Sequence, residues 1–187
     1  MFYTLINLKK QDVIKNRLFN RYDYHQYVWS FFKKEVQRNF LFDVEDNGDE
    51  IIFRILSEKA PEKCDCVEID KNFFNYNTYY VDIRFCPVKK DVKTKKRFAI
   101  TNKEQILSWL KRNVEKFGIK VIELELTSRP DTEIYFKDKN KIFRTSVSAK
   151  MIISGNEVSI ENFMTKGIGV GKSDGFGMPK LYWSKMA

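Results

Sequence analysis

The sequence contains one histidine and three cysteines among 187 residues. A structural zinc site needs about four Cys or His ligands, so Cys64, Cys66 and Cys86 do not predict one. An odd number of cysteines without a signal peptide is typical of a reduced, cytoplasmic protein. No apolar run approaches the roughly 20 residues of a membrane helix. We therefore expect a cytoplasmic protein with no metal, no other cofactor and no membrane partner.

Acidic residues are fewer than basic ones: the chain has 25 Asp and Glu but 34 Lys and Arg, which gives a net charge of +9. This excess favours a polyanionic partner, with nucleic acid first. A lysine-rich proteome is the alternative explanation. Clustering argues against that alternative, because six basic residues fall within nine positions that hold a single acid, Asp91. They are Lys89, Lys90, Lys93, Lys95, Lys96 and Arg97.

Glycine is scarce, and five of the eight glycines lie between Gly167 and Gly177. Glycine permits positive φ and close backbone approach, and with Lys166 and Lys172 this loop could hold phosphates. A P-loop is excluded because Lys166 stands where its first glycine belongs, and a dinucleotide fingerprint is excluded by Asp174. We therefore expect no nucleotide cofactor. A tight connection between two elements is the structural alternative.

Hydrophobic periodicity predicts an α+β protein of two tandem ferredoxin-like domains, residues 1–88 and 89–187. One helix is expected to begin at the N-cap Asp23, with Gln26 completing a capping box, and to run to about Arg38. A second is expected to begin at the N-cap Thr101, with Glu104 completing the box, and to end at Gly118. Strands are expected at 2–8, 40–45, 50–56, 78–85, 97–100, 120–126, 133–136, 142–147, 150–154, 157–160 and 178–183, with a helical turn at 161–165.

The acidic run at residues 43–50 could supply metal ligands. It surrounds Asn47-Gly48, a strong signal for a hairpin turn. We therefore expect a solvated turn rather than a metal site.

His25 lies near the predicted start of the first helix, three residues after Tyr22. Packing or surface exposure would explain a histidine on this apolar stripe. The functional interpretation is that a helix N-terminus attracts phosphate, and that histidine transfers protons near neutral pH. RNA carries its own nucleophile, the 2′-hydroxyl, so metal-free cleavage needs only geometry, charge stabilisation and proton transfer. One histidine would need a tyrosine, a lysine or constrained RNA geometry as its partner.

Several motifs together resemble the CasE family of CRISPR repeat-processing endoribonucleases, within the RAMP superfamily. The similarity runs nearly end to end. Its most specific part is the C-terminal loop with Gly167-Ile168-Gly169, Lys172-Ser173 and Gly175-Phe176-Gly177. The other matching segments are Tyr22-Asp23-Tyr24-His25 and residues 40–45, 80–89, 105–110 and 155–163.

The resemblance implies cleavage of CRISPR precursor RNA at the base of the repeat stem-loop, without metal, leaving a 2′,3′-cyclic phosphate. It implies His25 as general acid or base, Tyr22 as orienting the 2′-hydroxyl or assisting proton transfer, and Lys172 as neutralising the scissile phosphate. The expected partners are the repeat RNA and other subunits of the Cascade complex. The expected RNA-binding residues are Lys89, Lys90, Lys93, Lys95, Lys96, Arg97, Lys137, Lys139, Lys141, Arg144, Lys166, Gly167, Gly169, Gly171 and Ser173.

Three residues depart from the family pattern. Cys86 replaces an asparagine before a proline, Asp174 adds a negative charge to the glycine loop, and Asp138 dilutes the basic hairpin. None of the three removes an expected catalytic residue. Two other functions remain open: an RNA-hairpin-binding subunit that does not cut, and a structural subunit that bridges RNA to partner proteins.

Overall fold

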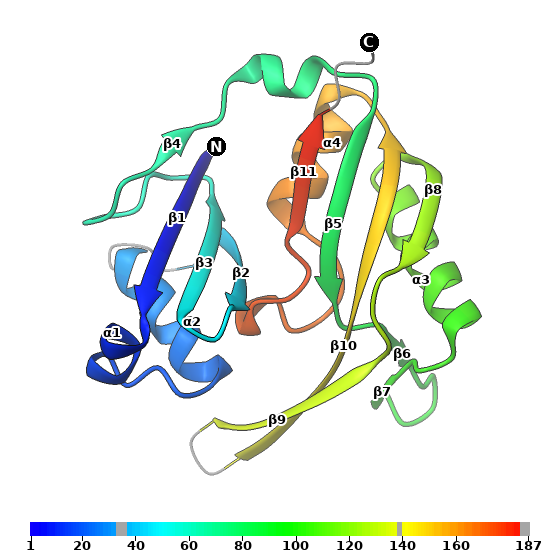
Figure 1. The fold of residues 1–187 in the computed structure, drawn as a ribbon. Helices are drawn as coiled ribbons and strands as arrows, with labels where there is room; N and C mark the ends of the chain where they lie inside the picture. Colours follow the sequence, from blue (N-terminus) through cyan, green and yellow to red (C-terminus); the bar gives the residue numbers. More distant parts are fainter. Residues whose placement is uncertain (33–36, 138–139, 184–187) are drawn as a thin grey trace.

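The computed structural model describes residues 1–32, 37–137 and 140–183, which form two antiparallel sheets side by side (Figure 1). The first sheet has the order β2-β3-β1-β4, and helices pack on one of its faces. Residues 58–66, which join β3 to β4, form no helix. Its elements in chain order are β1 (Phe2–Lys9), α1 (Lys10–Lys15), α2 (Arg21–Trp29), β2 (Phe40–Asp46), β3 (Glu50–Ser57) and β4 (Val67–Glu68).

The second sheet has the order β11-β5-β10-β8. Strand β9 pairs with the first half of β10, from Asn140 to Ser146. A strand order in which the first strand lies between the fourth and the third, with a helix after the first and third, is ferredoxin-like. The second sheet has both features, whereas the first has the same strand order but, in the described part of the chain, helices only after its first strand. The chain therefore folds as two tandem ferredoxin-like domains, as expected, with the first lacking its second helix at residues 58–66. The elements are β5 (Tyr79–Phe85), α3 (Lys103–Glu115), β8 (Lys120–Leu126), β9 (Asp131–Lys137), β10 (Asn140–Ser154), α4 (Glu157–Lys166) and β11 (Pro179–Trp183). A small hairpin, β6 (Val88–Lys90) with β7 (Arg97–Ala99), follows β5.

The two sheets divide earlier in the chain than expected. Strand β5 lies inside the second sheet, between β11 and β10, and not in the first. The division therefore falls between Glu68 and Tyr79 rather than after residue 88. We take that position as the proposed domain boundary.

An asparagine begins each of the three longer helices. Asn20 accepts hydrogen bonds from the N–H groups of Tyr22 and Asp23, Asn102 from Gln105, and Asn156 from Ser159. The predicted caps at Asp23 and Thr101 are therefore wrong. Asp23 instead accepts from the Asn20 N–H at 3.1 Å and completes the capping box from within the helix.

Three predicted elements are also wrong. Helix α2 ends at Trp29 and passes into a 3₁₀ turn at Ser30–Phe32, so Arg38 is not helical. Strand β10 is one continuous strand, because its first half pairs with β9 and its second half with β5 and β8. The residues predicted as a strand at 157–160 belong to α4, which Asn156 caps.

The core of the described chain consists of two apolar clusters, and the larger one includes Leu41 and Leu56 of the first domain beside residues of the second. The smaller cluster packs α2 on β2 and β3 through Val28, Phe42 and Phe53, which are fully buried. The larger cluster packs α3 and α4 on the larger sheet, where the Trp109 and Phe85 rings stack at 5.6 Å. Among the described residues, none of the helices is long and apolar enough to span a membrane.

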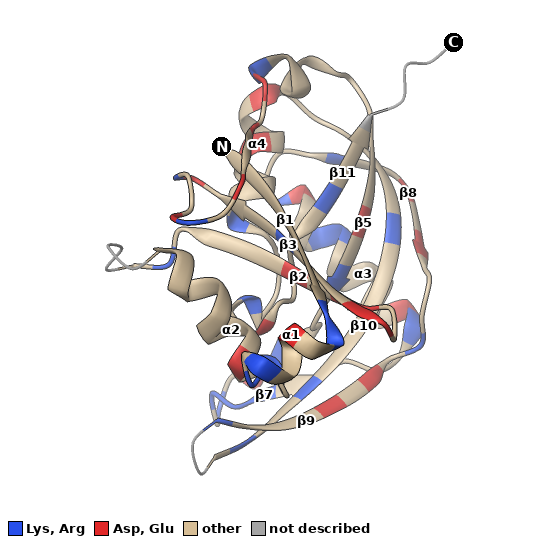
Figure 2. Cartoon of the chain, turned by 60° about the vertical axis from the view of Figure 1, so that its left-hand side comes forward, with Lys and Arg blue, Asp and Glu red and all other residues tan. Residues whose placement is uncertain are grey.

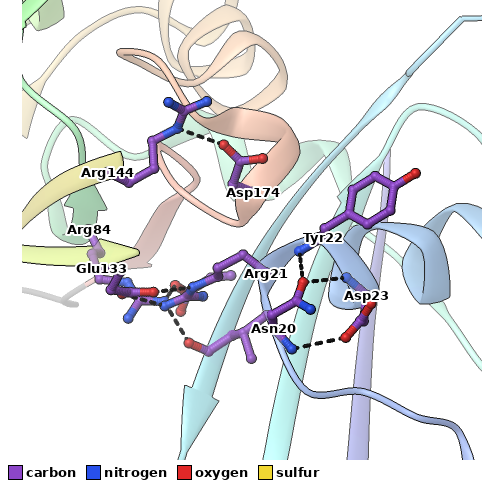
Figure 3. Close-up of polar contacts among 10 residues, drawn as sticks. Asn20, Arg21, Tyr22, Asp23, Arg84, Glu133, Arg144 and Asp174 are labelled. Atoms are coloured by element: carbon purple, nitrogen blue, oxygen red, sulfur yellow. Dashed lines mark hydrogen bonds and ion pairs between the residues drawn. The ribbon is translucent and has the colours of Figure 1, made fainter. Parts of the chain in front are cut away.

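Charged side chains join the two domains. The buried carboxylate of Asp43 on β2 lies 3.1 Å from Lys180 Nζ on β11 and 3.5 Å from Arg84 on β5. Arg21 on α2 forms a two-hydrogen-bond ion pair with Glu133 on β9, at 2.7 and 2.9 Å (Figure 3). The relative position of the domains is thus set by these directional contacts together with the apolar packing of Leu41 and Leu56 against the second domain.

The glycine loop lies between the domains, after α4. Ile168 N–H donates to Gly177 O at 3.0 Å, so the two ends of the loop cross. A Cβ on Gly177 would collide with Ile168 O, and a Cβ on Gly167 with Gly177 O. Only glycine allows this crossing.

We predict that Gly177→Ala destabilises the protein by at least about 3 kcal/mol, because strain at positive φ adds to a backbone collision. Gly48→Ala is the matched control, since Gly48 has φ +85 against +78 at Gly177 but no atom within 4 Å of the place where a Cβ would lie. The control should cost about 1 kcal/mol. Urea unfolding measures both free energies, and equal losses would show that the crossing is not tightly constrained.

Candidate functional site

His25 lies in the second turn of α2, against the first-domain core. Its half-buried ring packs beside Trp29, Phe40 and Phe42, with centroids 5.6, 6.4 and 6.4 Å away. Its Nδ1 atom is buried and has no hydrogen-bond partner among the described residues. The aromatic packing holds the ring in one orientation, as a proton-transfer group requires.

The charges around His25 come from three other segments. Partial burial and the guanidinium of Arg38 lower the pKa of His25, and the ammonium of Lys137 adds to this effect. The carboxylate of Asp174 raises the pKa and so opposes them. The net shift is downward, so the ring is mainly neutral at pH 7 and able to accept a proton.

Tyr22 lies three residues before His25 on α2, a spacing that places side chains on neighbouring parts of a helix surface. The Nζ atom of Lys137, at the end of β9, lies 5.5 Å from the centroid of the Tyr22 ring. Lys137 also acts on His25. The β9 end therefore meets α2 where both expected catalytic residues lie.

Lys172 belongs to a 3₁₀ turn, Lys172–Asp174, in the middle of the glycine loop. Its Nζ donates a hydrogen bond to Lys166 O at 2.7 Å. Burial and the guanidinium of Arg38 lower the pKa of Lys172. Because Arg38 acts on both His25 and Lys172, the first domain and the glycine loop share one electropositive region.

A groove of about 610 Å³ opens beside this region. Four basic side chains line it, together with the backbone of the glycine loop and the hairpin wall. Such a lining suits a chain of phosphates. The lining residues are Arg38, Cys86, Val88, Arg97, Ala99, Phe143, Arg144, Thr145, Gly169, Val170, Gly171, Lys172 and Ser173.

Asp174, the unexpected acid in the glycine loop, is paired. Its carboxylate accepts a hydrogen bond from Arg144 Nε at 2.7 Å (Figure 3). The pair ties the loop to β10 and partly neutralises both charges. Asp174 therefore orders the loop and does not simply repel a phosphate.

The remaining expected RNA-binding residues divide into three groups. The six of the β6–β7 segment are exposed, as are Lys137 and Lys141 on the β9–β10 hairpin. Both groups lie at the same end of the molecule (Figures 1 and 2). Lys139, expected at the hairpin tip, falls outside the described residues, as does Asp138. Lys166 and Gly167 precede the groove, and Gly167 is buried against Leu41 and Gly177.

Two other expectations are resolved by the structure. The acidic run does form an exposed turn, in which Asp46 accepts from the Gly48 N–H, but Asp43 is buried between the domains. Cys86 is buried and its backbone forms a bridge with Val170 of the glycine loop. Burial raises the pKa of its thiol to about 12, so Cys86 is not a reactive thiolate.

Sequence reasoning missed Arg38, which it places at the end of a helix and not in a groove. It also missed Phe143 and Thr145 on the groove wall, and the Arg21–Glu133 pair. The alternation of β10 could have indicated that Phe143 and Thr145 share a face. No sequence signal points to Arg38, because its place depends on where the preceding helix ends.

A family model described as CRISPR associated protein matches residues 1–181. No curated protein matches the chain significantly. Among solved structures the chain is similar to the CRISPR endoribonuclease Cse3 bound to 19 nt RNA, with 15% identity, coverage of 98% of this chain and 100% of that chain, and TM-score 0.81. It is similar to the CRISPR-associated protein Cas6e from Escherichia coli K-12, with 19% identity, coverage of 97% and 98%, and TM-score 0.73. It is also similar to a chain of a CRISPR RNA-guided surveillance complex, with 15% identity, coverage of 98% and 100%, and TM-score 0.63. At these identities the similarity establishes the fold.

We predict that the NMR titration of the His25 ring has its midpoint below the ordinary value of about 6.5. One histidine in the chain makes the signal unambiguous. Arg38→Gln removes a positive charge and should raise the midpoint, whereas Asp174→Asn removes a negative charge and should lower it. Shifts in the same direction for both variants would contradict this electrostatic description.

Proposed function

Because the chain belongs to the CRISPR associated protein family, we propose that it is an endoribonuclease that cuts CRISPR precursor RNA within the repeat. The cut lies at the base of the repeat stem-loop and yields mature guide RNA. The similarity to the RNA-bound endoribonuclease Cse3 supports this activity. The observation that carries the proposal is the position of the sole histidine, which packs among aromatic rings and interacts with Arg38, a residue that also lines the basic groove between the domains.

The reaction we propose needs no metal ion. Neutral His25 accepts the proton of a 2′-hydroxyl as that oxygen attacks the adjacent phosphorus, and the bond from phosphorus to the 5′-oxygen breaks. The departing 5′-oxygen takes up a proton from water, the imidazolium of His25 returns its proton to water, and the other product ends in a 2′,3′-cyclic phosphate. Tyr22 orients the 2′-hydroxyl. Lys172 stabilises the charge that develops on the phosphate oxygens.

The basic surfaces around the groove hold the RNA. We assign the exposed lysines of the β9–β10 hairpin to the groove of the RNA stem, and the β6–β7 segment to the neighbouring phosphates. Basic side chains that neutralise phosphates supply affinity without selecting sequence. The similarity to a chain of a surveillance complex supports a further step, in which the protein stays on its product as a Cascade subunit.

A second function is an RNA-hairpin-binding subunit that does not cut. The observation in its favour is the packing of His25 among three aromatic rings, which also suits a purely structural residue. The two functions share the RNA and differ in the chemistry.

We predict that the wild-type protein cuts the repeat RNA of the neighbouring CRISPR array in excess EDTA, leaving a cyclic phosphate. His25→Ala should lower the single-turnover rate by about 10²–10⁴ while changing the affinity little. Gel analysis of end groups and fluorescence anisotropy measure the two quantities.

Gln26→Ala is the matched control, because Gln26 is the exposed neighbour of His25 on the same helix. It should cut like the wild type. Tight binding without cutting by the wild type would favour the non-catalytic subunit, and equal loss of binding in His25→Ala would make His25 a packing or contact residue.

We predict that Lys141→Glu and Lys96→Glu each weaken RNA binding and reduce the slope of log affinity against log salt by about one. Lys120→Glu makes the same change in net charge on β8, at the end of the second sheet away from the hairpin. It should bind like the wild type. An equal effect in all three variants would mean that net charge, and not these surfaces, drives binding.

A further inference from the structure

One face of the β9–β10 hairpin carries exposed apolar side chains. Strand register places Phe143 opposite Ile134 and Lys141 opposite Phe136 on that face. Phe143 is 56% exposed and Phe136 58% exposed. Large aromatic residues left this accessible on a protein surface indicate a binding role.

The two phenylalanines differ in their surroundings. Phe143 lines the 610 Å³ groove together with Arg97, Arg144 and Lys172, whereas Phe136 is not among its lining residues. The Nζ atom of Lys141 lies 5.3 Å from the centroid of the Phe143 ring, a cation–π distance. Phe143 therefore places an aromatic residue at the wall of a basic groove.

A basic groove with an aromatic platform is how proteins bind single-stranded nucleic acid, with phosphates along the groove and bases on the rings. The volume agrees with this interpretation. A groove of about 610 Å³ lies in the roughly 300–1,000 Å³ range of small-molecule pockets. It can take a nucleotide or two but not a duplex.

The groove also adjoins the proposed site of cleavage. Arg38 and Lys172 both line it, and Arg38 is one of the charges that act on His25. A strand that leaves the stem at the cut phosphate would enter this groove directly.

We propose that the groove binds the single-stranded RNA that continues from the base of the stem-loop, and that Phe143 stacks on one of its bases. This inference rests on the proposed function and adds to it. It makes the substrate a stem-loop together with its single-stranded flank, and it makes Phe143 a residue that positions the flank beside His25.

The test compares two RNAs made from the repeat of the neighbouring array: a stem-loop with a blunt end, and the same stem-loop with its single-stranded flanks. Both RNAs carry 2′-deoxyribose at the stem base, and the second carries it in its flanks too. EDTA is present, so neither RNA is cut. Fluorescence anisotropy should show that the wild type binds the flanked RNA more tightly. Phe143→Ala should weaken binding of the flanked RNA by about 5- to 100-fold and leave binding of the blunt RNA unchanged.

Two variants control for the hairpin itself. Phe143→Trp should keep the preference for the flanked RNA, because an indole also stacks. Phe136→Ala removes an equally exposed ring outside the groove and should keep the preference too. A preference lost in both alanine variants would overturn the assignment to Phe143.

The other outcomes separate the two proposals. If the wild type binds both repeat RNAs no better than an unrelated RNA of equal length, the proposed function fails and the inference fails with it. If the wild type binds both repeat RNAs tightly and equally, or if Phe143→Ala weakens both alike, the proposed function stands and the inference is wrong. In the last case Phe143 contacts the stem.

Discussion

The buried carboxylate of Asp43 holds the two domains in the arrangement on which the candidate site depends. It lies on β2 of the first domain and contacts Lys180 and Arg84 of the second. A buried charge that loses its partners costs several kcal/mol, so separation of the domains at this point is strongly disfavoured. His25 comes from the first domain and Lys172 from the second. The roles that we propose for both residues on one phosphate require that arrangement.

The glycine loop extends the same constraint to the chemistry. Phe176 of the loop is buried beneath the guanidinium groups of Arg21 and Arg84, which lie 4.8 and 5.2 Å from its ring centroid. A Cβ on Gly175 would come within 3.0 Å of the Phe42 ring, the ring that also packs on His25. The loop and the histidine thus share one aromatic contact. Packing of the loop against Phe42 helps to fix the orientation of the imidazole ring.

The features that sequence predicts well here are those set by local chemistry. Strands from alternation, the turn at Asn47-Gly48, and the need for glycine at Gly167 and Gly177 all follow from short segments. The errors arise where distant segments decide. By chain order β5 belongs to the first half, yet it lies in the second sheet because β10 and β11 pair with it. Arg38 reaches the groove because α2 ends early at Trp29. The helix starts were misplaced for local reasons. Asp23 serves as the third helical residue of the capping box that Asn20 begins, and Asn102 is a stronger cap than Thr101.

The position of the glycine loop near the C-terminal end of the chain has a consequence during protein synthesis. Domains fold as the ribosome releases them, N-terminal parts first. When His25 and its aromatic neighbours have already packed, residues 167–183 are still to be released, and β5 still lacks its neighbour β11. The groove and Lys172 are completed last. A nascent chain therefore carries the imidazole long before it carries the surface that would present RNA to it, and the candidate site assembles only after residues 167–183 have been released.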